Sequence, residues 1–151
     1  MTQSMEQAIL TSCDEIFPEV MEFTKEMVKQ YSVLNKEQGV LDVVEKNLQA
    51  LNLPVTRVPI DIKRIGKHPL FAPVEWDYDK KYNLVSAINP TSEGKTLVLN
   101  GHLDVVSATH FDMWTQAPNI PWEKDGWLYG RGAGDMQSGV AAMIYAVHAI
   151  Q

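Results

Sequence analysis

The N-terminal part of the chain has apolar residues at helical spacing. Within residues 5–31 they recur every three or four positions, which places them on one face of a helix. The members of this set are Ile16, Val20, Phe23 and Met27. Pro18 interrupts the segment, and proline is tolerated in the first turn of a helix, so we expect two helical pieces divided at Pro18.

A second helix is predicted over residues 36–51. Its apolar stripe consists of Val40, Val43, Val44, Leu48 and Leu51. Asn52 and Pro54 follow the stripe and should end the helix. Both apolar faces are expected to pack against a sheet.

Three segments read as strands. Residues 55–60 form the first, and residues 82–88 and 96–100 form the others, joined by the polar turn at 89–94. Because that connection is short, we expect the last two segments to pair as an antiparallel hairpin.

Two stretches between these elements show no periodicity. Residues 63–81 contain Gly66, Pro69, Pro73 and several aromatic side chains, and residues 101–125 are rich in loop-forming residues. Loops this long without regular structure are uncommon and are often functional.

The last segment, residues 138–151, is apolar on almost every side. A helix of this kind is typically buried all round. No Gly, Asn or Pro closes it, so we interpret the chain as truncated within a helix. Helices, then strands, then a helix entered from a glycine-rich loop predict a layered α/β sandwich with no second domain and no internal repeat.

Composition and charge exclude several classes of protein. A hydrophobic content of 45% and a charged content of 21% are typical of an ordinary globular domain, and 151 residues suffice for one. The net charge of -6 argues against nucleic-acid binding. Cys13 is the single cysteine, so an intrachain disulfide and a cysteine-based zinc site are excluded. Neither a secretory signal nor a membrane span is recognisable, and we expect a cytoplasmic protein without membrane contact.

The first stretch that carries chemistry follows the apolar run at 97–99. Gly101 allows the backbone to turn, and His102 and Asp104 then lie two residues apart, pointing the same way in extended chain. An imidazole can offer one nitrogen to a metal while the other donates to a carboxylate or carbonyl, which fixes its orientation. The alternative is a histidine at the end of a strand next to a capping aspartate.

The second stretch is the turn Gly130-Arg131-Gly132-Ala133-Gly134-Asp135, which leads into the last helix. Asp135 could simply cap that helix. A phosphate site is disfavoured, because no P-loop pattern is present and Asp135 places negative charge where the anion would sit.

Together the two stretches resemble one family of metallohydrolases. The segment Gly101-His102-Leu103-Asp104-Val105-Val106 is followed by Trp114 and then by Asp125-Gly126-Trp127-Leu128-Tyr129-Gly130-Arg131-Gly132-Ala133-Gly134-Asp135-Met136. This order is similar to that of the acetylornithine deacetylase, succinyl-diaminopimelate desuccinylase, aminoacylase and carboxypeptidase G family. The similarity is strongest from about residue 82 onward.

The resemblance implies a site with two zinc ions, with cobalt or manganese as possible substitutes. His102 would bind one ion, Asp135 would bridge both, and Asp104 would be the catalytic carboxylate behind His102. A cis peptide bond is implied at Asp135–Met136. Two departures from the family pattern stand at positions that are not ligands: Gln137-Ser138 replaces Lys-Gly, and Ser107 replaces Pro.

The same comparison implies that residues 1–151 are the N-terminal portion of a layered α/β/α zinc-exopeptidase-like catalytic domain with a mixed sheet. The adjacent Glu-Glu pair that supplies the general base, and the smaller domain that supports a homodimer, are absent. The implied function is cleavage of amide bonds in N-acyl amino acids or small peptides, with the chain inactive by itself. The alternative is a non-catalytic degenerate paralogue or interaction module that retains half of the fold.

Other residues with chemical potential have ordinary explanations. His110 and Asp112 form a second His-x-Asp pair, but we interpret them as part of a solvated loop. His148 lies on the apolar helix and is interpreted as a packing residue, and His68 falls in the irregular stretch.

Overall fold

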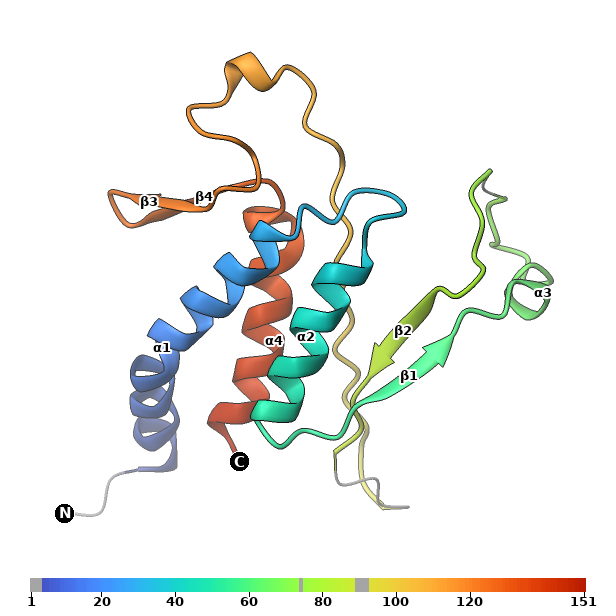
Figure 1. Ribbon diagram of the computed structural model, residues 1–151. Coiled ribbons are helices and arrows are strands. Elements are labelled where there is room, and N and C mark those ends of the chain that lie inside the picture. Colours follow the sequence, from blue (N-terminus) through green and yellow to red (C-terminus); the bar gives the residue numbers. More distant parts are fainter. Residues whose placement is uncertain (1–3, 74, 89–92) are drawn as a thin grey trace.

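The computed structural model describes residues 4–73, 75–88 and 93–151, and Figure 1 shows their arrangement. Three helices lie beside one another: α1 (Met5–Lys29), α4 (Ser138–Ala149) and α2 (Gln38–Ala50). The extended chain that leads to residue 106 runs along the helix layer. The β1–β2 pair projects from one side of this layer, and the β3–β4 pair lies at its upper end.

Helix α1 is continuous, which corrects the expectation of two pieces divided at Pro18. Ser4 caps its start, because the Ser4 hydroxyl accepts a hydrogen bond from the backbone N–H of Gln7 at 3.2 Å. Pro18 lies inside the helix, and Figure 1 shows the helix axis changing direction along its length. An internal proline removes one hydrogen bond and bends a helix. The bonds on either side of Pro18 keep α1 a single element.

The core lies where the three helices meet. Met27 of α1, Val40 of α2 and Ala141 of α4 are fully buried there. Met27 and Val40 come from the two predicted apolar stripes, so those helical faces are the ones that pack. A polar contact joins α2 to α4, since the Asn47 side-chain amide donates to the Tyr145 hydroxyl at 3.1 Å.

Helix α4 is buried on one side only, which corrects the expectation of a helix buried all round. Val140, Ala141 and Tyr145 face the core, whereas Ala142 and Ala146 are exposed. The composition of the helix is uniformly apolar, but within the described residues its main contacts are with α1 and η2, and these leave its other side uncovered.

The strands pair differently from the predicted hairpin. β2 (Tyr82–Val85) pairs with β1 (Thr56–Pro59), antiparallel, with Thr56 opposite Val85. The predicted partner, residues 96–100, adopts no strand, and part of the predicted turn, residues 89–92, lies outside the described residues. β1 therefore takes the place of residues 96–100 as the partner of β2. One more hydrogen bond, from the Ile60 N–H to the Lys81 carbonyl, extends this pairing.

A second antiparallel pair, not predicted, consists of β3 (Trp122–Lys124) and β4 (Trp127–Tyr129). The two-residue turn between them is Asp125-Gly126, and both residues have positive φ. Asp-Gly is a preferred pair for such tight hairpins. The Trp122 and Tyr129 rings stack across the pair with centroids 4.3 Å apart.

The predicted α/β class is therefore confirmed, with a helical layer beside extended chain. Among the described residues, the strands form two separate antiparallel pairs rather than one mixed sheet. The irregular stretch after β1 contains only the short helix α3 (Ile62–Ile65), and the loop after residue 101 contains the turn η1 (Phe111–Met113). No helix in the described parts of the chain has the length and apolar character needed to cross a membrane.

Candidate metal centre

The His-x-Asp motif lies where extended chain passes alongside α4. Gly101 allows this close approach, because a Cβ at this position would lie 2.8 Å from the Met143 side chain and 3.1 Å from that of Val140. His102 and Asp104 then extend away from the helix, and both side chains are substantially exposed.

The two sequence motifs meet at the His102 ring. His102 Nε2 lies 3.1 Å from Asp135 Oδ1, although the two residues are 33 positions apart. On its other side, His102 Nδ1 lies 3.0 Å from the backbone oxygen of Asp104 and 3.5 Å from its carboxylate. The structure thus brings together all three residues selected from the sequence.

The proton arrangement of His102 decides what this contact can do. A backbone carbonyl only accepts hydrogen bonds, so Nδ1 carries the proton that is donated to Asp104. In a neutral ring, Nε2 then presents a lone pair to the Asp135 carboxylate. That pair of atoms requires either a second proton or a cation between them.

The electrostatics of His102 agree with this requirement. Partial burial lowers the pKa of His102, but the hydrogen bonds to Asp104 and Asp135 and the charges of both carboxylates together raise it above the ordinary value. The environment therefore favours positive charge at this position.

A metal ion is the other way to supply that charge, and the donor set suits one. Imidazole nitrogen and carboxylate oxygen bind zinc at about 2.0–2.2 Å, so two such ligands in tetrahedral arrangement are about 3.3–3.6 Å apart. The observed 3.1 Å is within a few tenths of an ångström of this range. However, no group of three or more His, Cys, Asp or Glu residues that could hold a metal occurs among the described residues.

The glycine turn brings Asp135 to His102. Gly132 has a φ of 88°, and a Cβ there would lie 2.4 Å from Val105 Cγ1, so only glycine allows the turn to lie against the first motif. η2 (Ala133–Gln137) follows, and the Asp135–Met136 peptide bond is cis, as the resemblance implied.

Asp135 does not cap the last helix. Gln137 occupies the N-cap position of α4, and no side chain bonds to the free N–H groups there. The Asp135 side chain is instead 91% exposed and contacts His102. The geometry therefore does not support a helix-capping role for Asp135.

Three residues outside the two motifs help to hold them. Ser32 binds the chain between His102 and Asp104, the Gln137 side chain reaches Ser32, and the Tyr31 hydroxyl accepts from the Ala108 N–H at 2.8 Å. Ser32 and Tyr31 follow α1 and lie about 70 residues before the motif in sequence. Nothing in the sequence pattern distinguishes a serine or tyrosine after a helix from an ordinary turn residue.

The other histidines lie apart from this centre. His110 is exposed, with a left-handed backbone at the start of η1. His148 packs its ring edge-on to Tyr145, with centroids 6.1 Å apart. His68 accepts a hydrogen bond from the Leu70 N–H within the irregular stretch.

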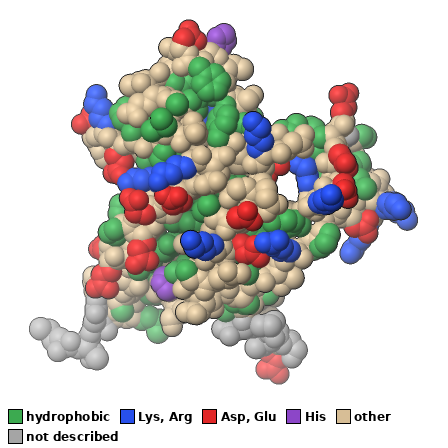
Figure 2. Space-filling model, in the orientation of Figure 1, with side chains coloured by type: hydrophobic (Ala, Val, Ile, Leu, Met, Phe, Trp, Pro, Cys, Tyr) green, Lys and Arg blue, Asp and Glu red, His purple; other side chains and the backbone are tan. Residues whose placement is uncertain are grey.

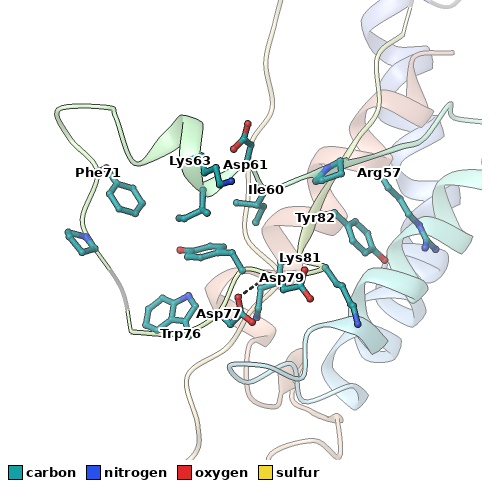
Figure 3. A pocket seen from close by; sticks show the side chains of 15 residues that line it. Arg57, Ile60, Asp61, Lys63, Phe71, Trp76, Asp77, Asp79, Lys81 and Tyr82 are labelled. Carbon is teal, nitrogen blue, oxygen red and sulfur yellow. Dashed lines mark hydrogen bonds between the residues drawn. The ribbon is translucent and has the colours of Figure 1, made fainter.

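A cavity formed by other residues also lies apart from this centre. An open cavity of about 830 Å³ is lined by residues between Arg57 and Tyr82. Figure 3 shows Phe71 and Trp76 on the side formed by the irregular stretch, with Tyr82 and Lys81 opposite. No residue of either motif lines this cavity.

Charges of both signs are interspersed on the face of the molecule shown in Figure 2. Hydrophobic side chains gather on its upper lobe, which corresponds to the loop around η1 in Figure 1. Exposed apolar residues of that loop include Val106, Phe111 and Met113.

Comparisons with known proteins agree with the motif order. Residues 98–151 match the profile of the peptidase family M20/M25/M40. The succinyl-diaminopimelate desuccinylase of Ruegeria pomeroyi is 39% identical over 123 residues, which cover 82% of this chain and 28% of the relative. The corresponding enzyme of Polaromonas sp. is 31% identical over 137 residues, covering 84% of this chain and 32% of the relative.

A solved structure is similar over almost the whole chain. Human carnosine dipeptidase 1 superposes with a TM-score of 0.71 and 28% sequence identity, covering 95% of this chain and 30% of that one. The chain thus spans about a third of the length of the relatives it matches.

Proposed function

Because the chain belongs to the peptidase family M20/M25/M40, we propose that it is part of a metal-dependent hydrolase that cleaves amide bonds in N-acyl amino acids or small peptides. Residues 1–151 would form the N-terminal portion of its catalytic domain. The contact between His102 Nε2 and Asp135 Oδ1 carries this proposal, because it joins two motifs into one donor set for a cation.

In the proposed site, His102 would hold a zinc ion through Nε2. Asp104 keeps the ring in the required tautomer, since its backbone oxygen accepts from Nδ1. Asp135 would be the carboxylate ligand shared by the two ions, for which its exposed oxygens are available. A pair of zinc ions, when bound, would polarise the scissile carbonyl and lower the pKa of a bound water.

The described residues would hold the metal ions and orient the His102 ring, but they would not provide a general base. The sequence contains no Glu-Glu pair, and the carboxylates near His102 are engaged with its ring. We therefore expect the 151-residue chain alone to bind zinc weakly and to be inactive. The complete enzyme would be a cytoplasmic homodimer that acts on small molecules rather than on nucleic acid.

The substrate follows from the amide chemistry that the names of the relatives share. A desuccinylase removes an acyl group and a dipeptidase cleaves a peptide, so both an N-acyl amino acid and a small peptide fit. A non-catalytic paralogue that retains half of the fold is the competing proposal. It predicts no metal binding at His102.

Zinc titration of the 151-residue chain tests the site. Isothermal calorimetry should detect zinc binding that His102→Ala or Asp135→Asn weakens at least tenfold. Changing a residue that only hydrogen-bonds to a metal ligand already costs about 10–100-fold in metal affinity, and these two residues are proposed ligands themselves.

His110→Ala is the matched control, because it removes an exposed histidine from the second His-x-Asp pair. It should leave the affinity for zinc unchanged. Equal weakening by His110→Ala and His102→Ala would show non-specific binding and would contradict the proposal.

A further inference from the structure

A buried serine after α1 is bonded to the chain at Leu103 and Val105, on either side of Asp104. Ser32 is fully buried, and its hydroxyl donates to the backbone oxygen of Leu103 at 2.6 Å. Its carbonyl accepts from the Val105 N–H at 2.9 Å. Leu103 lies between His102 and Asp104, so these two bonds fix the backbone from which both side chains extend.

The same serine also faces the Asp135 turn. Gln137 is fully buried, and its side-chain amide lies 3.4 Å from Ser32 Oγ and 3.4 Å from the Met27 carbonyl oxygen. The single hydroxyl proton of Ser32 is given to Leu103, so Ser32 Oγ acts as the acceptor toward Gln137. The backbone N–H of Gln137 donates to the Gly132 carbonyl at 3.0 Å, which closes the turn that contains Asp135.

The residues of the metal centre cannot fix their own separation. The Asp135 side chain is 91% exposed and that of His102 is 46% exposed, so water competes for every contact between them. The bonds of Ser32 and Gln137 are buried, where an unpaired polar group costs more free energy than it does in water. The geometry of the exposed pair is therefore set beneath the surface.

On the premise of the metal centre proposed above, we propose that Ser32 is the positioning residue that sets His102 against Asp135. Ser32 contacts neither the metal nor the substrate. It holds the extended segment around His102 directly and the Asp135 turn through Gln137. This arrangement gives a role to Gln137, which replaces the lysine that is usual in the family.

Imidazole NMR of the metal-free chain, with selectively labelled histidine, tests this role. In the wild-type chain we expect His102 to show a resolved Nδ1-protonated signal that is distinct from the signal of exposed His110. Ser32→Ala should shift the His102 signal toward that of His110. It should also speed hydrogen exchange at the Val105 amide about two- to tenfold, the range expected for loss of one hydrogen bond.

Thr24→Ala is the matched control. Thr24 is also buried, but its hydroxyl donates to the Val20 carbonyl of its own helix at 2.7 Å. This variant should lose comparable stability and leave the His102 signal in place. Gln137→Leu removes the amide on the other side of Ser32 and should also shift the His102 signal.

An unchanged His102 signal in Ser32→Ala, or an equal change in Thr24→Ala, would overturn the proposal. Both measurements are made without metal, so they decide the role of Ser32 independently. Absence of zinc binding to the wild-type chain would count against the proposed function alone.

Discussion

The helix layer with its two motifs differs in burial and in hydrogen bonding from residues 60–81, the segment that contains the irregular stretch. In the first, Met27, Val40 and Ser32 are fully buried, and bonds between distant segments hold the motifs. In the second, residues 61–70 are all exposed, and the hydrogen bonds within 61–80 join near neighbours in sequence. The cavity of about 830 Å³ nevertheless lies in the second region, whereas the residues of the candidate metal centre lie in the first.

The cavity and the candidate metal centre therefore lie in different regions of the molecule. The open cavity arises because the stretch loops away from the helices, and its aspartates serve local turns: Asp61 caps α3, and Asp77 accepts from the Asp79 N–H. The candidate metal centre lies at the surface, with the buried Ser32 and Gln137 beneath it. Paired substitutions in the two regions test this contrast.

The largest difference is expected from truncating one leucine in each region. Leu48 is 5% exposed in the core, and Leu70 is 86% exposed in the irregular stretch. Leu48→Ala should lower the free energy of unfolding by about 2–5 kcal/mol, because it leaves a cavity. Leu70→Ala should change it by less than about 0.5 kcal/mol. Chemical denaturation measures both, and similar losses would mean that the stretch packs as firmly as the core.

Substituting two glycines with positive φ distinguishes the overlap of a new side chain with its neighbours from backbone strain. Gly132→Ala and Gly126→Ala both strain the backbone, at φ values of 88° and 81°. The Cβ at 132 would overlap Val105, whereas the one at 126 has nothing within 4 Å. Gly132→Ala should therefore cost about 1–3 kcal/mol more than Gly126→Ala in the free energy of unfolding. Equal costs would show that the turn does not press against the His102 motif.

Hydrogen bonds to backbone N–H groups should contribute differently to the free energy of unfolding in the two regions. Tyr31→Phe leaves the buried Ala108 N–H without its acceptor and should cost about 1–3 kcal/mol in unfolding free energy. Asp77→Ala removes an exposed acceptor from Asp79, where water can replace it, so its cost should be a few tenths of a kcal/mol. Thermal denaturation compares them, and a larger loss for Asp77→Ala would reverse the contrast.

The smallest effect concerns the ion pair at the border of the two regions. Burial raises the pKa of Glu37. The Lys81 ammonium at 3.0 Å and the N–H groups of Glu37 and Asn35 lower this pKa by more, so it lies below the ordinary value. Glu37 therefore contributes stability that is fully present above its unfolded pKa, about 4.3, and is lost as pH falls through the folded pKa.

A pH series of denaturation curves measures this contribution. Glu37→Gln should lower the unfolding free energy by less than about 1 kcal/mol at pH 7, and the difference from wild type should shrink as pH falls below about 4. A difference that stays constant with pH would show that the ionised carboxyl contributes nothing.

The sequence predicted those parts of the fold that depend on local pattern. The apolar stripes identified α1 and α2, and the strand predicted at residues 55–60 is present as β1. Strand pairing was predicted less well, since residues 96–100 are as apolar as a strand but do not pair with β2. The Asp-Gly hairpin at 125–126 could have been found from its turn signal and the aromatic residues beside it.

The same division holds for the candidate site. The sequence by itself determined which residues are candidates for the metal site, because His102, Asp104 and Asp135 stand in short motifs whose residue types are recognisable without coordinates. Only the tertiary structure decided that Asp135 faces His102 rather than capping α4, and that Ser32 and Gln137 lie beneath both. A motif is a local property of the chain. The distance between two motifs depends on buried bonds between segments about 70 to 105 residues apart, and residue type alone does not specify these bonds.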